Sequence, residues 1–347
     1  RSAVDLSAHA RMNIPLDKSV PGQTPEPVNS SFTPKWKRQT INLDFWFGPL
    51  NWASPQFTLD VSRQYTWAPL GNINELLPLT RGCPADSAGY LLFAHEVVSN
   101  LPRRVDLGGM ICYSPMVYDR YVADLSLGSE AYWGKFKSKV RYNLKRTIRQ
   151  FTEACDGVLD WRCYQTPEEV PEFHRLSVAI AEQTYQQKLF DGGLPNTPEF
   201  LAHLQEKARM NDLRAYLLFM KGEAIAYLHL EAEDGSLSYA YVGHKPELSN
   251  LSPGSVLMAS AIDALLIEKR FHTLDFGSGD GQHKQVFSTR TKRVTHTFLL
   301  KPTRRNRSII FVHDYFSRFA ESVVTVLKNW NLHHKFKRLV RKAASRV

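Results

Sequence analysis

The chain has 347 residues with 43% hydrophobic and 22% charged side chains, a composition that is ordinary for a globular protein with a sizeable core, and its length predicts one large or two modest domains. It contains no apolar run of about 18 residues, which excludes a membrane-spanning helix. The net charge of +10 is local, because twelve Lys and Arg stand against two acids from residue 301 onward. Residues 1–300 carry no net charge, which argues against an enzyme that binds nucleic acid through a basic main face. The excess of basic residues instead indicates a C-terminal segment that acts through its charge.

The four cysteines show neither a CxxC pair nor a spacing to histidine that would suit a metal. We interpret them as buried small hydrophobic residues in a reducing compartment, without a disulfide framework. No segment resembles a secretory leader. These features predict a cytoplasmic protein that needs no metal.

The expected elements begin with an extended lead-in at 1–35, which is rich in Pro, Ser and Asn. Residues 36–123 hold many aromatic residues and short strand-like runs, and predict a smaller α/β unit. At 124–153 the pattern changes to a basic helix in which apolar residues recur at helical spacing. Over 168–210 the residue pattern has the period of a helix, with an interruption at 191–200.

A meander of three strands is expected at 213–243. Two dipeptides that favour hairpin turns, Lys221-Gly222 and Asp234-Gly235, separate these strands.

A long helix follows at 252–270, with Ser252 at its N-cap and Pro253 at its first helical position. A short strand, a glycine-rich turn, a short helix and a last strand at 294–300 complete the order. This order predicts a mostly antiparallel sheet with one added strand–helix unit, and it lacks the strict alternation of a doubly wound parallel sheet.

Residues 275–287 read DFGSGDGQHKQVF and raise the question of a phosphate-binding loop. A dinucleotide fold carries its loop after the first strand with GxGxxG spacing. Here the loop comes late, its spacing is GxGxG, and Asp280 inside it would repel a phosphate. The better anion site is the start of the 252–270 helix, where backbone N–H groups and the helix dipole favour negative charge. The alternative is that this is an ordinary helix start that binds no anion, because many helices begin with the same types of residue.

This order of elements resembles the acetyltransferase fold known as GNAT. The stretch SPGSVLMASAIDALLIEKRFHTLDFGSGDGQHKQVF is similar to the C-terminal signature of the CelD-like acetyltransferase family, which is named for a cellulose-biosynthesis protein. KSKVRYNLKRTIRQFTE is similar to its N-terminal signature. The family is related to the FemAB aminoacyl transferases, which use two GNAT-like halves.

The resemblance covers about 124–302 and implies an α/β (α+β) fold with a mixed, mostly antiparallel sheet flanked by helices. It makes 36–123 a degenerate N-terminal GNAT-like half and leaves 303–347 as a basic amphipathic C-terminal helix. It also implies an acyl thioester as co-substrate, supplied by acyl-CoA or by an acyl carrier protein.

The resemblance places the donor as follows. The pyrophosphate of the acyl-CoA would lie at Ser252, Gly254 and Ser255. The strand at 239–243, with Val242, would offer backbone groups to the pantetheine amides.

Amine acylation needs an amine that loses a proton, a polarised thioester oxygen and a protonated leaving thiolate. Asp275 or Asp280 could orient or deprotonate the amine. The alternative is that Asp280 caps the short helix and Asp275 satisfies N–H groups of the turn. The family continues from its Gly-Asp turn to Tyr-Lys, and His283 stands where Tyr is typical. His283 is therefore the candidate for the acid role, with a surface or packing role as its alternative.

The other candidates are substrate contacts. Lys284 is expected to hold a carboxylate or phosphate, unless it only pairs with Asp280 along the helix. The basic helix at 124–153 supplies either a second anionic contact or merely a solvated face. The remaining candidates are Arg141, Lys145, Arg146, Tyr241 and His244, with Glu231 and His244 as reserve bases.

The C-terminal region predicts a long amphipathic helix. Apolar residues recur at a 3-4 spacing over 307–330, which favours a helix packed on the domain. The last twenty residues contain seven Lys and Arg and no acid, so we expect 331–347 to lie on an anionic membrane surface. The alternative is a helix whose basic end is solvated.

We therefore predict an N-acyltransferase that moves an acyl group from acyl-CoA, or another acyl thioester, to an amine on a lipid, polysaccharide or other envelope precursor. The first alternative is a FemAB-type transferase that takes an aminoacyl group from tRNA, although the neutral body disfavours nucleic acid. The second is a non-catalytic, membrane-associated scaffold. We expect the protein in the cytoplasm, at the inner face of the membrane.

Overall fold

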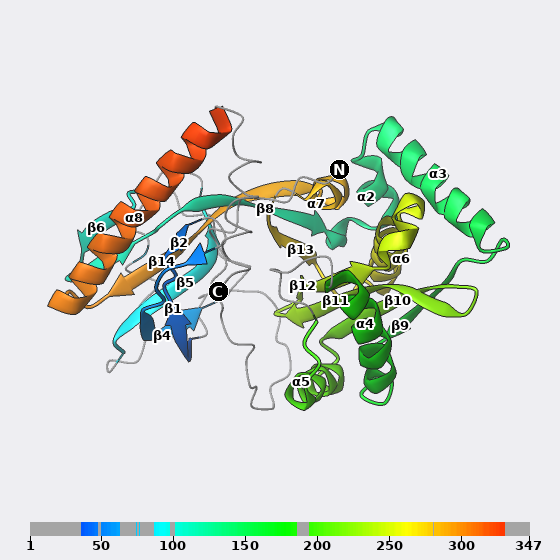
Figure 1. Ribbon diagram of the computed structural model, residues 1–347, viewed down its shortest axis with the longest axis horizontal. Coiled ribbons are helices and arrows are strands. Elements are labelled where there is room, and N and C mark those ends of the chain that lie inside the picture. Colours follow the sequence, from blue (N-terminus) through cyan, green and yellow to red (C-terminus); the bar gives the residue numbers. More distant parts are fainter. Residues whose placement is uncertain are drawn as a thin grey trace. The chain divides into compact units, whose positions relative to one another are not determined.

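The computed structural model describes residues 36–47, 50–62, 74, 76, 87–97, 101–185, 194–279 and 281–329. These residues form two compact units, and most of their helices and strands are labelled in Figure 1. Unit 1 contains the described residues up to Asp119 and from Lys292 onward, and unit 2 contains those from Arg120 to Thr291. The domain limits drawn from the sequence stay a prediction.

Unit 1 combines a sheet with one long helix. The sheet has the order β1-β4-β5-β14-β7-β6, in which β4 and β5 are parallel and the other neighbours antiparallel. The strands are β1 Lys37–Asn42, β4 Gln56–Ser62, β5 Gly89–Glu96, β6 Arg104–Leu107, β7 Met110–Tyr113 and β14 Arg290–Leu300, which belongs to this unit from Lys292 on. A separate pair is β2 Trp46–Phe47 with β3 Leu50–Asn51.

The helix of unit 1 is α8, Arg304–Asn329. It packs on the sheet through Ile309 and Ile310, against an apolar cluster that includes Phe298. The prediction of a packed amphipathic helix from 307 onward is thus confirmed as far as Asn329. Residues 331–347, with their predicted membrane contact, lie outside the described residues.

Unit 2 contains a six-stranded sheet covered on both faces. The order is β9-β10-β11-β12-β13-β8, antiparallel except for the parallel neighbours β12 and β13. The strands are β8 Val117–Asp124, in this unit from Arg120, β9 Asp160–Tyr164, β10 Leu213–Met220, β11 Glu223–Glu233, β12 Ser236–His244 and β13 Thr273–Ser278. The predicted mixed, mostly antiparallel sheet flanked by helices is confirmed.

The helices of unit 2 form two layers. On one face lie α2, α3 and α6, whose apolar side chains share a cluster with β10, β11 and β13. On the other lie α4 and α5, which share a second cluster with β9, β10 and β11. The bounds are η3 Leu125–Leu127, α2 Ser129–Gly134, α3 Ser138–Ala154, α4 Val170–Tyr185, α5 Pro198–Arg209, η4 Pro246–Leu251, α6 Pro253–Glu268 and α7 Gln282–Phe287.

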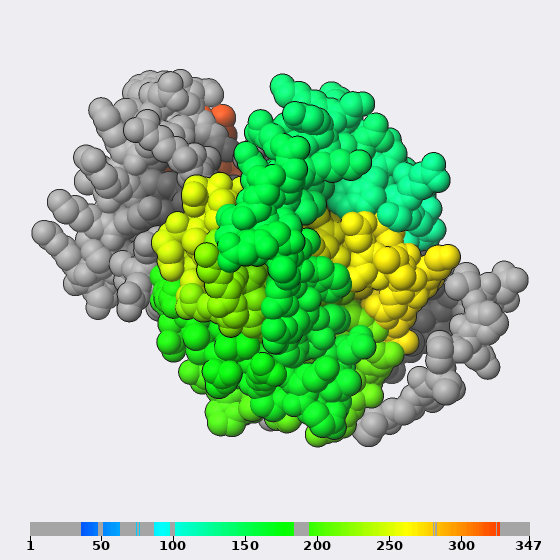
Figure 2. Space-filling model, turned by 90° about the vertical axis from the view of Figure 1, so that its right-hand side faces the viewer, coloured from blue at the N-terminus to red at the C-terminus, as the bar shows by residue number. Residues whose placement is uncertain are grey.

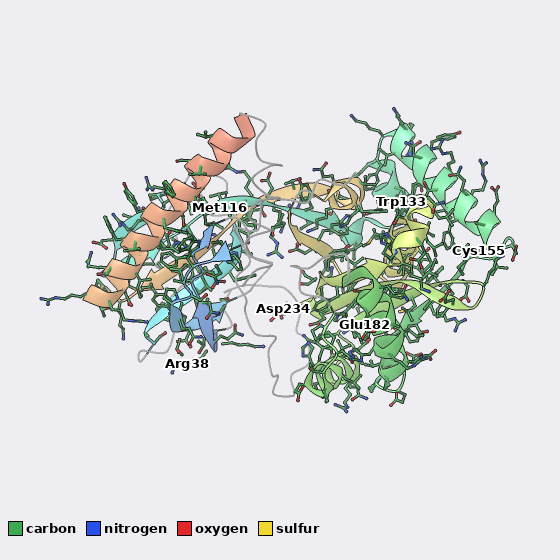
Figure 3. All side chains as sticks on the ribbon, in the orientation of Figure 1. Arg38, Met116, Trp133, Cys155, Glu182 and Asp234 are labelled. Atoms are coloured by element: carbon green, nitrogen blue, oxygen red, sulfur yellow. The ribbon has the colours of Figure 1, made fainter. Side chains whose placement is uncertain are left out.

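Two tight hairpins build the meander β10–β11–β12. Lys221 and Gly222 have φ values of 51° and 81°, and Asp234 and Gly235 have 48° and 75°. Positive φ at both central residues defines the turn whose twist matches that of antiparallel strands. Both predicted turns are confirmed, and Asp234 is labelled in Figure 3 at the turn between β11 and β12.

Helix α6 is the central element of the first layer. Its residues Val256, Leu257, Ala261 and Leu265 are buried, as are most residues between them. Trp133 of α2, labelled in Figure 3, donates from Nε1 to Asp263 Oδ1 at 2.6 Å. A helix buried on nearly all sides is held firmly, so its N-terminus has a defined place beside the sheet.

Three of the four cysteines lie in the described chain, and none of these three forms a disulfide. Cys112 and Cys155 are buried, which matches their interpretation as small hydrophobic residues, whereas Cys163 is half-buried. Cys83 lies outside the described residues. No described helix has the length and apolarity that crossing a bilayer requires.

The packing of the meander can be tested by a substitution at Gly243 of β12. A Cβ atom at this position would lie 2.5 Å from Cε1 and 2.9 Å from Cζ of the buried Tyr227, its partner on β11. We expect Gly243→Ala to lower the free energy of unfolding by about 1–3 kcal/mol, because the ring has to move within a packed core. Chemical denaturation of the purified variants measures this change.

The matched control is Gly134→Ala, at the end of α2, where a Cβ meets no atom of the described residues within 4 Å. This change should be neutral or slightly stabilising, since alanine is the better helix former. Equal stability of the two alanine variants would show that Tyr227 does not pack on Gly243 as described.

Candidate active site

The two parallel strands of unit 2 separate before they end. β12 and β13 pair at Ser236–Thr273, Leu237–Leu274 and Ser238–Asp275, and the ladder stops there. Both strands then continue, β12 to His244 and β13 to Ser278. We call these diverging segments, 239–244 and 276–278, the strand fork. Backbone groups on the inner side of a diverging pair are available to a ligand in extended conformation.

A β-bulge in β12 lies at the base of the strand fork. His229 of β11 is opposite Tyr241, whereas Leu230 is opposite Tyr239, so Ala240 is an extra residue on β12. The bulge reverses the alternation of side chains. Tyr239 therefore packs with the α6 layer and Tyr241 with the α4–α5 layer, although a regular strand would have put both on one face.

The open end of the strand fork leads to the start of α6. After β12 the chain passes through η4 to Ser252, which has left-handed backbone angles of 52° and 48°. Ser252 is the N-cap as predicted, but its side chain makes no capping hydrogen bond; its carbonyl oxygen accepts from the N–H groups of Ser255 and Val256. Helix α6 thus begins beside the end of β12.

Gly254 leaves room at this helix start. Among the described residues outside the backbone of α6, the only atom within 4 Å of a Cβ built there is Nδ1 of His244, at an ordinary contact distance of 3.8 Å. His244 ends β12, and its Nε2 lies 3.2 Å from Oγ of Ser249. His244 and Gly254, two residues singled out in the sequence, are thus brought together with the first turn of α6.

Asp275 is engaged at the point where β13 leaves β12. The residue is 3% exposed, and its Oδ1 accepts from the N–H of Gly277 at 2.7 Å. Arg120 of β8 donates from Nε to Oδ1 at 3.2 Å, and its Nη2 lies 2.9 Å from Oδ2. Of the two roles considered for Asp275, these contacts match the support of the turn, since both carboxylate oxygens have partners.

The glycine turn itself has the backbone expected of it. Gly277 and Gly279 have φ values of 72° and 101°, a region that favours glycine. Asp280, the second catalytic candidate, lies outside the described residues. Its role stays a prediction.

Helix α7 places His283 over the strand fork. Nε2 of His283 lies 3.2 Å from the hydroxyl of Tyr239, and that tyrosine ring meets Phe276 of the facing strand edge-on, with centroids 5.9 Å apart. Burial, with a smaller contribution from Tyr227, raises the pKa of Tyr239, so its hydroxyl stays protonated at neutral pH. Lys284 donates to the carbonyl of Ser278 and so holds the turn.

No hydrogen bond or ion pair joins the basic residues of α3 to these groups within the described part of the chain. Leu144 and Ile148 face the α6 layer, whereas Arg146 and Lys145 are exposed. Arg141 donates to Ser138 of the same helix. Figure 2 views unit 2 from the side on which α3 lies. The structure therefore assigns these cations to a helix face, and their contact with a substrate stays a prediction.

Glu231, a reserve base in the sequence, lies in a group that the sequence did not reveal. Its Oε2 is 3.1 Å from Nε2 of His203, and its Oε1 is 3.2 Å from Nε2 of His229. The ring of Tyr241 stacks on His229 at 5.7 Å, and Phe200 packs edge-on against both rings. We call these five residues the Glu231 cluster.

Two effects on the pKa of Glu231 oppose each other. Burial raises the pKa, but the contacts with His203 and His229 outweigh it and lower the pKa below its usual value. The carboxylate is thus ionised at neutral pH. The described residues contain no group of three or more His, Cys, Asp or Glu arranged to hold a metal ion.

Sequence reasoning missed several residues of both sites. The alternation His229-x-Glu231 on one strand was a usable signal, because such residues share a face. Arg120 gave no signal, since it lies 155 residues from Asp275. His203 gave none either, because it meets Glu231 only through the packing of α5 on the sheet.

Comparison with known proteins supports the chemistry. A family model described as an acetyltransferase (GNAT) domain matches residues 138–285. The chain thus contains a GNAT-type acyltransferase domain, which makes it an enzyme of acyl transfer and confirms the predicted GNAT-like fold. Kinship with the CelD-like family stays a prediction. No curated protein matches the chain.

The solved structures that match the chain share little of its sequence. A structure of FemX has 10% identity and a TM-score of 0.48, and the match covers 76% of this chain and 88% of that one. L-PGS from Bacillus licheniformis has 12% identity and a TM-score of 0.43, with 66% and 73% covered. A GCN5-related N-acetyltransferase from Kribbella flavida has 12% identity and a TM-score of 0.32, with 78% and 90% covered.

The ion pair between Arg120 and Asp275 can be tested by a double-mutant cycle. Removing either partner leaves the other charge buried, so Asp275→Asn and Arg120→Met should each cost about 3–5 kcal/mol in the free energy of unfolding. The double variant should cost less than the two changes together, because neither charge is then left alone. Guanidinium denaturation gives all four values.

The control for this cycle is Arg209→Met, which removes the exposed pair with Glu206 and should cost less than about 1 kcal/mol. Additive effects of Asp275→Asn and Arg120→Met would mean that the two side chains do not interact in solution.

Proposed function

We propose that unit 2 binds an acyl thioester in the strand fork and transfers its acyl group to an amine. The observation that carries this proposal is the parting of β12 and β13 beside the start of α6. An extended donor with a diphosphate at one end suits this arrangement, because the strand fork and the helix start are consecutive along it.

The start of α6 would receive the diphosphate. Ser252, Gly254 and Ser255 lie in its first turn, where backbone N–H groups and the positive end of the helix dipole attract an anion. The absence of a side chain at Gly254 lets a phosphate approach the backbone closely. These are the residues that the sequence proposed for the donor.

The pantetheine arm would run along β12. Beyond Ser238 this strand no longer pairs with β13, so its inner backbone edge can bond the pantetheine amides as a neighbouring strand would. Val242, which is 39% exposed, lies on this segment. Acyl-CoA is the donor that fits this description, and an acyl carrier protein would present the same arm.

The chemistry needs a proton for the leaving thiolate. We assign it to the pair of Tyr239 and His283, whose contact of 3.2 Å lies over the strand fork. Tyr239 keeps its proton at neutral pH and His283 can resupply it from solvent, to which it is exposed. Asp275 serves this site by fixing the turn, and Asp280 stays a catalytic candidate.

The acceptor would be an amine on a lipid, polysaccharide or other envelope precursor. Lys284, Arg141, Arg146, Tyr241 and His244 stay candidates for contacts with it. An anionic membrane would be met through 331–347. The support for this is α8, which exposes Phe311, Tyr315 and Phe319 on one side before the basic segment begins.

The donor site is tested by Gly254→Asp. The added carboxylate would repel the diphosphate and should weaken the binding of acetyl-CoA and of a long-chain acyl-CoA by about tenfold or more. Stability should not fall, because an acid in the first turn of a helix is favourable and the space is open. Calorimetric titration gives the affinities and thermal unfolding gives the stabilities.

The control is Gln150→Glu, which adds the same charge at an exposed position of α3. Unchanged affinity in Gly254→Asp would contradict a diphosphate at α6. If neither acyl-CoA bound the native protein while an aminoacyl-tRNA did, the donor would be of the aminoacyl-tRNA class. If none of these bound, the scaffold alternative would stand.

A further inference from the structure

Helix α8 carries an apolar stripe on its exposed side. Ten large apolar residues of the described chain are exposed, and five of them belong to this one helix. Spacings of four and seven residues put these five on one side of α8, along a length of about 22 Å. They are Phe311, Val312, Tyr315, Phe319 and Val326, and we call them the α8 stripe. Exposed apolar residues that gather in this way mark an interaction surface.

The α8 stripe is not needed to hold the helix on unit 1. The opposite side of the helix does this, where Ile310 is buried and Phe45 meets His313 edge-on with ring centroids 4.8 Å apart. Within the stripe, Phe319 also stacks on Phe47 of β2, with centroids 6.2 Å apart, and still remains 57% exposed. The stripe therefore presents accessible surface to a partner without any change in the fold of unit 1.

The charges nearest the α8 stripe are positive. The two acids of α8, Asp314 and Glu321, form ion pairs with Arg103 at 3.1 and 2.9 Å, and neither belongs to the stripe. Arg304 begins the helix, seven residues before the first residue of the stripe and so on the same side. Arg304 and Arg104 of β6 are exposed, and neither forms an ion pair with a described residue.

A groove borders the α8 stripe at its N-terminal end. It has a volume of about 600 Å³ and lies between α8 and the pair β6–β7; Figure 1 shows β6 beside α8. Its lining includes the apolar side chains of Val105 and Phe311, and the guanidinium of Arg104 lies 5.4 Å from the ring centroid of Phe311. The other charges that line the groove, Arg307 and Asp106, pair with each other at 3.1 Å. Arg104 therefore leaves the groove with a net positive charge.

The surface of a bilayer with anionic lipids suits both features. Apolar side chains of an interfacial helix lie among the acyl chains, while Lys and Arg side chains reach the phosphates. Tyrosine favours this region because its ring is apolar and its hydroxyl is polar, and Tyr315 is at the centre of the stripe. The chain also continues beyond Asn329 into 330–347, whose sequence contains six Lys and Arg and no acid. The positive charge thus goes on along the chain from the end of the stripe.

Two other occupants of the α8 stripe fit these charges less well. A second copy of the chain would bring like charges together. In a parallel pair of α8 helices Arg304 would face its own counterpart, and in an antiparallel pair it would face the end that the basic segment follows in the sequence. Residues 1–35 contain four basic and three acidic residues, so they offer no net negative charge.

We propose that the α8 stripe docks unit 1 on a bilayer that contains anionic phospholipid. The rings of Phe311, Tyr315 and Phe319 enter the region below the headgroups, and Arg104 and Arg304 contact lipid phosphates, with the groove as the place of one headgroup. The proposed function assigns the membrane contact to 331–347, whereas this inference assigns it to described residues of unit 1. It applies whether or not unit 2 transfers an acyl group.

The test measures the binding of the full chain to vesicles by sedimentation. Vesicles of phosphatidylcholine alone are compared with vesicles in which about one third of the lipid is phosphatidylglycerol. We expect the native chain to bind the anionic vesicles about tenfold or more tightly than the neutral ones, because several cations lie near the surface. Added salt should weaken this binding, since it screens those charges.

Substitutions in the α8 stripe separate its contribution from that of the basic segment, which they leave intact. The triple variant Phe311→Ser, Tyr315→Ser and Phe319→Ser should bind anionic vesicles about tenfold or more weakly than the native chain, because three rings lose their contact with lipid. Arg104→Gln should weaken binding to anionic vesicles by about threefold or more and leave binding to neutral vesicles unchanged.

The matched control replaces three exposed apolar residues of unit 2 in the same way. It should bind both kinds of vesicle as the native chain does, because these residues form no stripe. The substitutions are Tyr142→Ser, Val158→Ser and Ile267→Ser.

A second measurement reports contact with the acyl chains directly. Tyr315→Trp places an indole at the centre of the α8 stripe, and brominated acyl chains quench an indole that they touch. We expect brominated anionic vesicles to quench this variant more strongly than the native chain.

The proposal is overturned if the triple variant binds as the native chain does, because the basic segment then makes the contact alone. It is also overturned if brominated vesicles quench Tyr315→Trp and the native chain equally. Failure of the native chain to bind either kind of vesicle overturns it too, whether a second copy or residues 1–35 cover the stripe. Should the triple variant fail to fold, Tyr315→Ser alone decides, at a residue that is 73% exposed, with an expected loss of about threefold or more.

Discussion

The parting of β12 and β13 is the constraint on which the site depends. Strands that have begun to pair in parallel would normally continue to do so, because each further pair satisfies backbone groups. Here the ladder ends at Ser238 and Asp275 although both strands go on. The carboxylate of Asp275 supplies part of the reason, since it binds the N–H of Gly277 and so turns β13 at its next residues.

Arg120 stabilises this turn through its ion pair with Asp275. A buried carboxylate is costly unless it is paired, and the two-point contact with Arg120 provides the pairing at 12% exposure of the arginine side chain. Arg120 comes from β8, the neighbour of β13 on its other edge. The turn that opens the strand fork is therefore fixed from the β8 side, opposite the side on which we propose that the donor binds.

The bulge at Ala240 places Tyr239 and Tyr241 on opposite faces of the sheet. It sends Tyr239 toward His283 and the α6 layer, and Tyr241 toward Glu231 and the α4–α5 layer. The protonated hydroxyl of Tyr239 and the ionised carboxylate of Glu231 then stand on opposite sides of one strand. The hydroxyl of Tyr239 can donate a proton and the carboxylate of Glu231 can only accept one, so the two faces of β12 differ in their acid–base character.

The sequence by itself determined the elements whose causes are local. Lys221-Gly222 and Asp234-Gly235 specify tight hairpins because the second residue of each turn is a glycine at positive φ, a conformation that suits few other residues. Pro253 and the apolar run after it specify α6, which lies within the residues 138–285 that match an acetyltransferase domain. Only the tertiary structure decided the pairing of Arg120 with Asp275, the group around Glu231 and the opposite facing of Tyr239 and Tyr241. The physical reason is that these contacts depend on partners 28 to 155 residues away in the sequence and on one inserted residue in a strand ladder. Neither produces a periodic pattern of residues in the sequence.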